Sequence, residues 1–318
     1  PTRLREAMVN SRNLVSIRLL RDVGISYARD YIQNFGFDLS DLPNNLTLAL
    51  GTASVPPLSM ARGYSVFANG GFLVTPEYIR EIHHDTGTVV YRTEPAILCD
   101  DCLEVVEEAT ETEAAEELTR PEFRRLEIAE KPDEASGPAS ASELARQLEN
   151  DEPNYAMRVI SAQNAYLVRS MMMDVVKRGT GKRAMQLGRQ DLAGKTGTTN
   201  EQRDAWFSGY NDYLVTSVWV GFDNHDPLGR NEVGGRAALP IWMEFMGAAL
   251  EGLEDRPPKL PEGLAQARID PETGLIATLD NEAAIMEIFE VGRLPPMEAD
   301  TGGEDQNVSP SEDPYEIY

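Results

Sequence analysis

The chain has 318 residues, a hydrophobic fraction of 41% and a formal net charge of −24. This length allows one large hydrophobic core or two smaller ones, so a globular enzyme domain is feasible. No apolar run reaches the roughly 18 residues that a membrane-spanning helix needs, so we expect no segment of this sequence to cross a membrane. The sequence opens at Pro1 without an initiator methionine or a signal peptide, and we interpret it as the interior of a longer protein.

The negative charge is concentrated in two segments. Residues 100–152 hold 18 acidic and 5 basic side chains, and residues 298–318 hold 7 acidic side chains and no lysine or arginine. The remaining residues therefore carry a net charge of about −4, and the two acidic segments have the composition of disordered chain. Because no basic surface is left to neutralise phosphates, we expect no nucleic-acid partner.

The first part of the chain has the pattern of compact helical structure. Apolar residues at four-residue spacing predict helices over 3–10 and 14–23, the second ending at Gly24. Pro56-Pro57 begins another helix, which runs to Ala68 and stops at Asn69-Gly70-Gly71. Short strands are predicted over 72–74, 78–83 and 88–91, with a turn at 85–87.

Residues 93–154 are rich in Glu, Ala, Ser and Pro. This composition favours a solvated surface insertion, and a segment that binds a partner is the alternative. Cys99 and Cys102 border it as Cys-Asp-Asp-Cys, which we interpret as a local structural disulfide or an incidental pair, consistent with an oxidising compartment. A redox motif would open a helix after a strand, and a zinc site would need two further ligands that His83, His84 and His225 do not provide in a matching pattern.

Structure is predicted to resume near Tyr155. A buried helix ends at Arg178-Gly179, and its apolar stripes are Leu167, Met171 and Val175 beside Val168, Met172 and Val176. Period-two patterns then predict three sequential strands over 195–199, 205–210 and 214–222, the last two joined by a turn at Asn211-Asp212. A closing helix covers 237–250, with Trp242, Phe245 and Met246 on its apolar side, and short strands follow within 257–296.

The strongest chemical signal is Lys195-Thr196-Gly197-Thr198-Thr199 on a predicted strand. Side chains alternate along a strand, so Thr196 and Thr198 lie on one side, where two hydroxyls can hold one carboxylate. Gly197 leaves room for another backbone to approach, and Lys195 adds a positive charge. Taken alone, the same residues also suit a strand-edge turn with a solvated lysine.

A second signal is Ser11-Arg12-Asn13. On a regular helix, residues two positions apart lie about 200° apart around the axis, so Ser11 and Asn13 could not face the same ligand. If they act together, the backbone must break between the first two predicted helices. The alternative is an ordinary helix cap, since serine and asparagine are favoured where a helix begins.

Together, in this order, the two motifs match the active-site signature of penicillin-binding proteins and serine β-lactamases. Several stretches resemble the bifunctional, class A penicillin-binding proteins: residues 5–13, the segment from Leu48-Ala49-Leu50-Gly51-Thr52-Ala53 to Ala68-Asn69-Gly70-Gly71, Arg178-Gly179-Thr180-Gly181, and Lys195–Asn200 running into Asp204–Tyr210. The resemblance covers most of residues 1–92 and 155–296. It implies an α+β fold with an antiparallel sheet flanked by helices, whose N-terminal part is missing.

In this family a serine attacks the D-Ala-D-Ala end of a peptidoglycan stem peptide and forms an acyl-enzyme, which an amine of a neighbouring stem peptide resolves into a cross-link. The resemblance implies that Ser11 relays a proton to the departing amine and that Lys195 orients Ser11. Asn13 would bind the acyl side chain. Thr196 and Thr198 would bind the terminal carboxylate beside Gly197, and the Thr198 N–H would stabilise the oxyanion, a role often worth about 3 kcal/mol.

One feature of the family is absent from the sequence. Its nucleophile and general base belong to an SxxK motif, and no serine here has lysine three residues on; Ser26 and Ser59 have arginine there, which stays protonated. Because the motif precedes SxN in the family, we expect the nucleophile before Pro1, in a segment lost by truncation. The glycosyltransferase domain and membrane anchor typical of the class would lie there too.

The resemblance implies peptidoglycan stem peptides and β-lactam antibiotics as ligands, further cell-wall-synthesis proteins as partners, and no cofactor or metal. It implies action at the periplasmic face of the bacterial inner membrane. The predicted segments are a helical part with SxN (1–92), the acidic insertion (93–154), a sheet part with KTG (155–255), a C-terminal extension (256–296) and an acidic tail (297–318).

Two alternatives remain open. A D,D-carboxypeptidase or β-lactamase would have the same fold, but no glutamate stands in the context that a class A β-lactamase uses for deacylation. The other alternative is a non-catalytic acidic interaction scaffold. Labelling by a fluorescent penicillin separates an enzyme from a scaffold.

Overall fold

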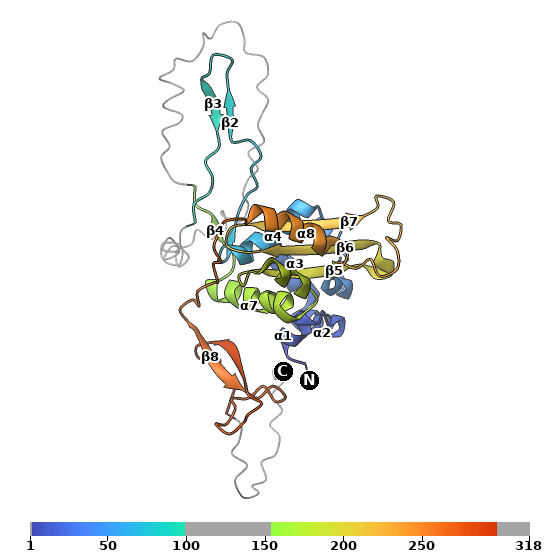
Figure 1. The fold of residues 1–318 in the computed structure, drawn as a ribbon, viewed down its shortest axis with the longest axis vertical. Helices are drawn as coiled ribbons and strands as arrows, with labels where there is room; N and C mark the ends of the chain where they lie inside the picture. The colour runs from blue at the N-terminus through green and yellow to red at the C-terminus, as the bar shows by residue number, and fades with distance from the viewer. Residues whose placement is uncertain (1, 99–153, 298–318) are drawn as a thin grey trace, which may run out of the picture. The chain divides into compact units, whose positions relative to one another are not determined.

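The structure is a computed structural model that describes residues 2–98 and 154–297. These residues belong to two compact units, one formed by residues 2–74 and 157–297 and the other by residues 75–98 and 154–156. All of the helices in the described residues, and the largest sheet among them, belong to the first unit (Figure 1). The division into five segments stays a prediction, and most of the acidic insertion, the two cysteines and the tail lie outside the described residues.

The N-terminal helices follow the predicted pattern. Helices α1 (Leu4–Val9) and α2 (Asn13–Val23) form where apolar spacing predicts them, and α4 (Pro57–Ala68) forms between the predicted start and stop signals. Helix α3 (Ile25–Ile32) has no counterpart among the predicted elements. Gly24 ends α2 with a φ of 95°, a value that glycine adopts without strain, and the chain re-enters a helix at the next residue. Short 3-10 helices follow: η1 (Gln33–Phe35), η2 (Leu39–Asp41) and η3 (Leu46–Leu50).

The central sheet confirms the three period-two segments. Strands β5 (Ala193–Thr198), β6 (Asp204–Tyr210) and β7 (Val215–Gly221) pair in that order, and both pairings are antiparallel. Strand β6 is therefore central, and β5 lies at one end of the sheet that the described residues form. This end strand carries Lys195, Thr196 and Thr198.

Helices cover both faces of this sheet. Phe207 and Tyr210 of β6 are three positions apart and therefore point to opposite faces. Phe207 meets Trp242 of helix α8 (Ala238–Ala249) edge-to-face, with ring centroids 4.9 Å apart. Tyr210 lies 6.2 Å from the Tyr64 ring of α4, and it packs with Met172 and Met173 of helix α7 (Ala162–Arg178). The fold is thus α+β, with an antiparallel sheet between helices (Figure 1).

Two details of the helix faces differ from the prediction. Trp242 and Met246 of α8 are fully buried, but Phe245 is 52% exposed, because the buried face runs through Leu239, Trp242 and Met246 and leaves Phe245 at its margin. Helix α7 buries an unpredicted charged residue: Arg169 lies 2.5 Å from Asp212 and over the ring of Tyr210. A periodic pattern of apolar residues cannot reveal such a pair, because its acidic partner comes from a distant turn.

Shorter pairings complete the two units. In the first, β1 (Phe72–Leu73) pairs with β4 (Met157–Arg158), and β8 (Leu264–Ile269) pairs with β9 (Ile285–Glu290). In the second, β2 (Glu81–His83) and β3 (Val89–Arg92) form an antiparallel hairpin that is shorter than predicted at its first strand. Among the described residues, no helix combines the length and the apolar character required to cross a membrane.

A buried ion pair joins the start of β5 to the chain that follows α8. Asp191 is fully buried and accepts two hydrogen bonds from Arg189, at 2.9 and 2.7 Å, and one from the Asn211 side chain at 3.1 Å. Arg189 also donates to the Leu253 carbonyl at 2.6 Å. Burial by itself would raise the pKa of Asp191. Its hydrogen bonds, chiefly those from Arg189, have the larger combined effect and lower the pKa below its usual value.

Replacing Asp191 by Asn is expected to destabilise the 318-residue chain by about 3 kcal/mol in urea unfolding at pH 7, because the buried Arg189 would lose its buried partner and keep only the more distant and partly exposed Asp255, at 3.4 Å. The lowered pKa means that Asp191 stabilises the fold above about pH 4 and loses this effect as the pH falls through its folded-state value. The difference from wild type should therefore shrink in acid. Exposed Asp223→Asn is the control, and a wild-type midpoint for Asp191→Asn would contradict the assignment.

Candidate active site

The backbone breaks at Ser11. Helix α1 ends at Val9, α2 begins at Asn13, and Ser11 between them has a φ of 51°, which is rare for a residue with a side chain. The Arg12 N–H donates to the Ala7 carbonyl at 2.8 Å and so closes the bend. The predicted break between these helices is confirmed. Ser11 lies outside both helices, Asn13 is the first residue of α2, and both residues are exposed.

The two predicted motifs meet at Lys195. Its ammonium group donates to the Ser11 hydroxyl at 2.9 Å and to the Thr196 carbonyl at 3.0 Å. Ser11 and Lys195 are separated by 184 positions in the sequence. Ser11 lies between α1 and α2, and Lys195 lies on β5. The structure therefore brings the SxN bend to the end strand of the sheet.

Hydrogen bonding along β5 decides which backbone groups face outward. Antiparallel pairs alternate between bonded and non-bonded positions. The Thr199 N–H donates to the Asp204 carbonyl at 3.1 Å, so the pairs at Thr199, Gly197 and Lys195 face β6. The backbone groups of Thr196 and Thr198 then point away from β6, toward the outer edge, and the bond from Lys195 to the Thr196 carbonyl agrees with this.

Lys195 is half-buried. Burial lowers the pKa of its ammonium group to about 8, since the charged form is poorly solvated there. The group still carries its proton at neutral pH, and it can lose the proton near pH 8, where a free lysine would not.

The two threonine hydroxyls of β5 each have a partner that was not predicted. The Thr198 hydroxyl accepts a hydrogen bond from the Gly234 N–H at 3.0 Å, and the Thr196 hydroxyl lies 2.8 Å from that of Thr180. Thr180 belongs to a stretch quoted above only for its family resemblance, and Gly234-Gly235 is a visible glycine pair. Neither signal could indicate which strand the residue contacts.

Glycine is needed where two of these segments approach the site. A Cβ on Gly179 would lie 2.5 Å from the Val9 carbonyl oxygen, and one on Gly234 would lie 2.2 Å from the Trp206 carbonyl oxygen and 2.5 Å from that of Gly197. All three distances are too short for any side chain. We predicted that another backbone would approach the strand at Gly197. The backbone of Gly234 does so, and it is the missing side chain of Gly234 that permits the approach.

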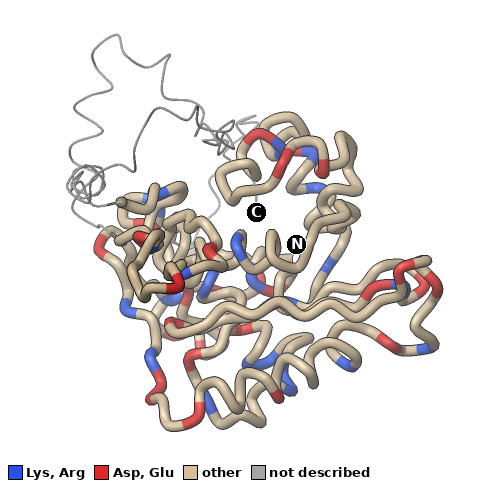
Figure 2. Tube along the Cα trace, turned by 90° about the horizontal axis from the view of Figure 1, so that it is seen from above, with Lys and Arg blue, Asp and Glu red and all other residues tan. Residues whose placement is uncertain are grey.

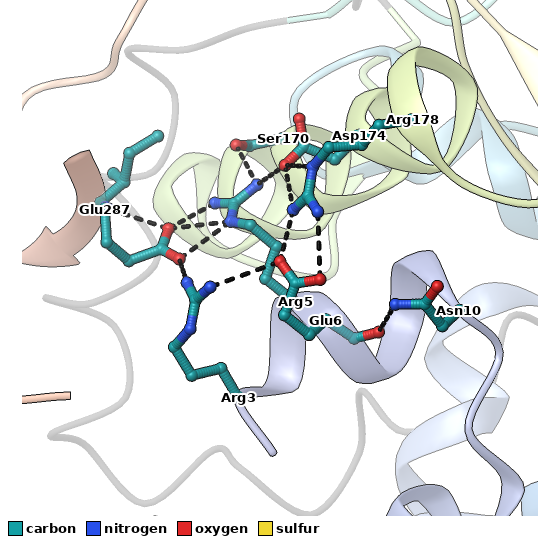
Figure 3. A network of polar contacts seen from close by, with 9 residues as sticks. Arg3, Arg5, Glu6, Asn10, Ser170, Asp174, Arg178 and Glu287 are labelled. Atoms are coloured by element: carbon teal, nitrogen blue, oxygen red, sulfur yellow. Dashed lines mark hydrogen bonds and ion pairs between the residues drawn. The ribbon is translucent and has the colours of Figure 1, made fainter. Parts of the chain in front are cut away.

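Helix α1, which leads to Ser11, is held by an ionic network (Figure 3). Arg5 forms a two-pronged pair with Glu287 of β9, with its shortest distance 2.6 Å, and also contacts Asp174 of α7. Arg178 binds Glu6 at 2.7 Å and lowers the pKa of that carboxylate. The network joins α1, α7 and the β8–β9 hairpin.

Two cavities, of about 460 and 350 Å³, lie at this network, and neither is lined by Ser11 or Lys195. Within residues 2–98 and 154–297, no three His, Cys, Asp or Glu side chains gather closely enough to hold a metal ion. Basic and acidic residues are interspersed along the described chain, so no large region carries one sign of charge (Figure 2). The chemical groups gathered near Lys195 are its ammonium group and the hydroxyls of Ser11, Thr196 and Thr198.

Comparison with known proteins shows which family the chain resembles. A family model described as the penicillin binding protein transpeptidase domain matches residues 1–246. Penicillin-binding protein 1A of Pseudomonas aeruginosa is 46% identical over 297 residues, which cover 93% of this chain and 35% of that protein. Penicillin-binding protein 1A of Escherichia coli is 36% identical over 94% of this chain and 38% of that protein.

The crystal structure of penicillin-binding protein 1A from Haemophilus influenzae superposes with a TM-score of 0.74 at 33% identity, covering 93% of this chain and 41% of that one. The chain thus spans a little over a third of the length of these curated relatives.

Replacing Glu287 by Gln is expected to lower the free energy of unfolding by about 3 kcal/mol, because the largely buried Arg5 would lose its two-pronged partner and keep only Asp174, at 3.4 Å. The matched control is Glu290→Gln on the same strand, whose partner Arg293 is 81% exposed, and it should cost less than about 1 kcal/mol. Urea unfolding of the 318-residue chain compares the two. Equal losses of unfolding free energy in the two variants would show that the buried Arg5–Glu287 pair stabilises the fold no more than an exposed pair does.

Replacing Lys195 by Met should stabilise the chain by about 1–3 kcal/mol at pH 7, because it removes a poorly solvated charge. Between about pH 8 and 10.5 the unfolded chain keeps a proton that the folded chain has lost, so wild-type stability rises with pH there. The gain from Lys195→Met should therefore fade across this range. Urea unfolding at pH 7 and pH 10 measures it, with exposed Lys182→Met as the control; a pH-independent difference would contradict the burial argument.

Proposed function

Because this chain belongs to the family of penicillin-binding protein transpeptidase domains, we propose that it supplies the proton-relay and substrate-carboxylate parts of a D,D-transpeptidase site. The substrate is the D-Ala-D-Ala end of a peptidoglycan stem peptide, and β-lactam antibiotics are the matching inhibitors. The observation that carries the proposal is the contact between Lys195 and Ser11 at 2.9 Å.

The chemistry requires a proton for the departing amine. A nucleophilic serine gives its proton to the general base of the SxxK motif and forms a C–O bond with the penultimate alanine carbonyl. The C–N bond to the last alanine breaks, and the released nitrogen must be protonated. Lys195 donates to the oxygen of Ser11, which leaves the Ser11 proton free to be passed to that nitrogen. Ser11 is the relay, and Lys195 supports it as a fixed positive charge.

The acyl-enzyme is then resolved by a second substrate. The amine of a neighbouring stem peptide forms a C–N bond with the acyl carbon, and the serine oxygen leaves with a proton returned along the same relay. Asn13, exposed at the start of α2, is proposed to hydrogen-bond the bound acyl side chain. Its position two residues beyond the bend at Ser11 supports this role.

The end strand is proposed to hold the substrate's terminal carboxylate. Thr196 and Thr198 supply hydroxyls to its oxygens, and the absence of a side chain at Gly234 lets its backbone lie against the strand at Gly197. The outward-pointing N–H of Thr198 is proposed as one oxyanion donor, which is typically worth about 3 kcal/mol in the transition state. The second donor would be the N–H of the nucleophile itself.

The nucleophile is proposed to lie outside these 318 residues, since no serine among them has lysine three positions on. In this proposal the 318 residues are inactive alone, and the longer protein also carries a peptidoglycan glycosyltransferase domain and a membrane anchor. That protein would act at the periplasmic face of the inner membrane, together with other cell-wall-synthesis proteins. The five-segment division, with its acidic insertion and tail, is part of the same proposal.

A fluorescent penicillin tests this function. The 318-residue chain should remain unlabelled, and the longer protein that includes the upstream serine–lysine motif should be acylated. In the longer protein, Lys195→Ala should lower the acylation rate by about 100-fold, the range expected when a proton-transfer partner is removed. Lys182→Ala, at an exposed position, is the matched control and should retain the wild-type rate.

Labelling of the 318 residues by themselves would refute the placement of the nucleophile. Acylation of Lys195→Ala at the wild-type rate would remove Lys195 from the mechanism. A longer protein that folds normally but is not labelled by the fluorescent penicillin would favour the non-catalytic scaffold.

A further inference from the structure

Thr180 lies at the junction of three segments that form the site. Its hydroxyl is 2.8 Å from that of Thr196, and its N–H donates to the Val9 carbonyl, at the end of the helix that leads to Ser11, at 3.3 Å. On its other side, a Cβ on Gly235 would lie 3.1 Å from the Thr180 carbonyl oxygen. The side chain is exposed, so no packing in the core accounts for a hydroxyl at this position.

A hydroxyl at position 180 affects which hydroxyl protons of β5 remain free for a ligand. A threonine hydroxyl has one proton to donate, whereas a carboxylate only accepts hydrogen bonds. Thr198 accepts from the Gly234 N–H, so its own proton stays available for a ligand. Between Thr180 and Thr196 one proton is used in their mutual bond, and the hydroxyl that accepts this bond keeps its proton.

We propose that Thr180 is a positioning residue of the carboxylate site, which donates to Thr196 and thereby directs the Thr196 proton toward the substrate carboxylate. With Thr198 fixed in the same way by Gly234, the strand presents two oriented protons, one for each carboxylate oxygen. This inference rests on the proposed function of the site. It adds Thr180 as a determinant of specificity for a ligand that ends in a free carboxylate.

The anchoring of Thr180 supports a positioning role. Gly179 lies against the Val9 carbonyl so closely that no side chain would fit, and the Gly181 N–H donates to the Val175 carbonyl at 3.1 Å. The backbone on both sides of Thr180 is therefore fixed to α1 and to α7. A hydroxyl on a fixed backbone can hold its neighbour in one orientation, which a freely moving side chain could not do.

The test uses the longer protein that includes the upstream serine–lysine motif, and two probes: a fluorescent penicillin with its free carboxylate and the methyl ester of the same compound. Second-order acylation rate constants are measured for wild type, Thr180→Val, Thr180→Ser, Thr196→Val and the double variant Thr180→Val/Thr196→Val. Thr88→Val, which removes one of the exposed Thr86–Thr88 hydroxyl pair in the other unit, is the matched control. Thermal melting verifies that each variant folds.

We expect Thr180→Val to slow acylation by the carboxylate probe about 10-fold, the effect of one lost orienting hydrogen bond, and to change the ester rate less than about 2-fold. Thr180→Ser should restore the wild-type rate. The double variant should match Thr196→Val, since Thr180 acts through Thr196 and the two losses do not add.

Each other result overturns the inference. A wild-type rate for Thr180→Val shows that the hydroxyl has no role, and an equal loss for both probes shows a structural effect without carboxylate selectivity. Losses that multiply in the double variant show that Thr180 contacts the ligand independently. If the wild-type longer protein is acylated by neither probe, the proposed function itself is wrong, which separates the two failures.

Discussion

The hydrogen bond from the Lys195 ammonium group to the Ser11 hydroxyl is the interaction on which the site depends. It joins residues 184 positions apart, at a distance of 2.9 Å, and it can form only if two backbone features occur together. One is the interruption between α1 and α2, where Ser11 adopts a positive φ. The other is the position of β5 at the end of the sheet, which leaves one side of the strand unpaired by β6.

Much of the surrounding structure fixes these two features in place. Arg5 and Arg178 hold α1 against α7 and the β8–β9 hairpin through carboxylates, and the Thr180 N–H binds the carbonyl of Val9. The sheet is held between α8 on one face and α4 with α7 on the other, by aromatic contacts of Phe207 and Tyr210. Elements far from Ser11 in sequence therefore determine where its hydroxyl lies.

The site uses one positive charge and several neutral donors. Lys195 is half-buried, and the lowered pKa shows that its charge is less well solvated than on a free lysine. A residue that lowers stability in this way is typical of functional sites, where the required group is retained despite its effect on folding. The carboxylate recognition proposed for Thr196 and Thr198 adds hydroxyl protons with fixed directions, and it needs no second buried cation.

The sequence by itself determined the local elements and the chemistry of the motifs. Periodic apolar residues predicted α1, α2 and the strands β5 to β7, because neighbours along the chain decide both the period and the buried face. The prolines at its start and the Asn-Gly-Gly stop predicted α4. The sequence also predicted that the backbone breaks between the first two helices if Ser11 and Asn13 act together, since residues two positions apart on a helix cannot act on one ligand. These inferences need no knowledge of distant contacts.

Only the tertiary structure decided which segments meet. It gave Thr196 and Thr198 their partners Thr180 and Gly234, paired Arg5 with Glu287, buried Arg169 and left Phe245 exposed. Each of these depends on how whole helices and strands pack against one another across long sequence separations. A side-chain period specifies which face of an element is buried, but it carries no information about the element that covers that face.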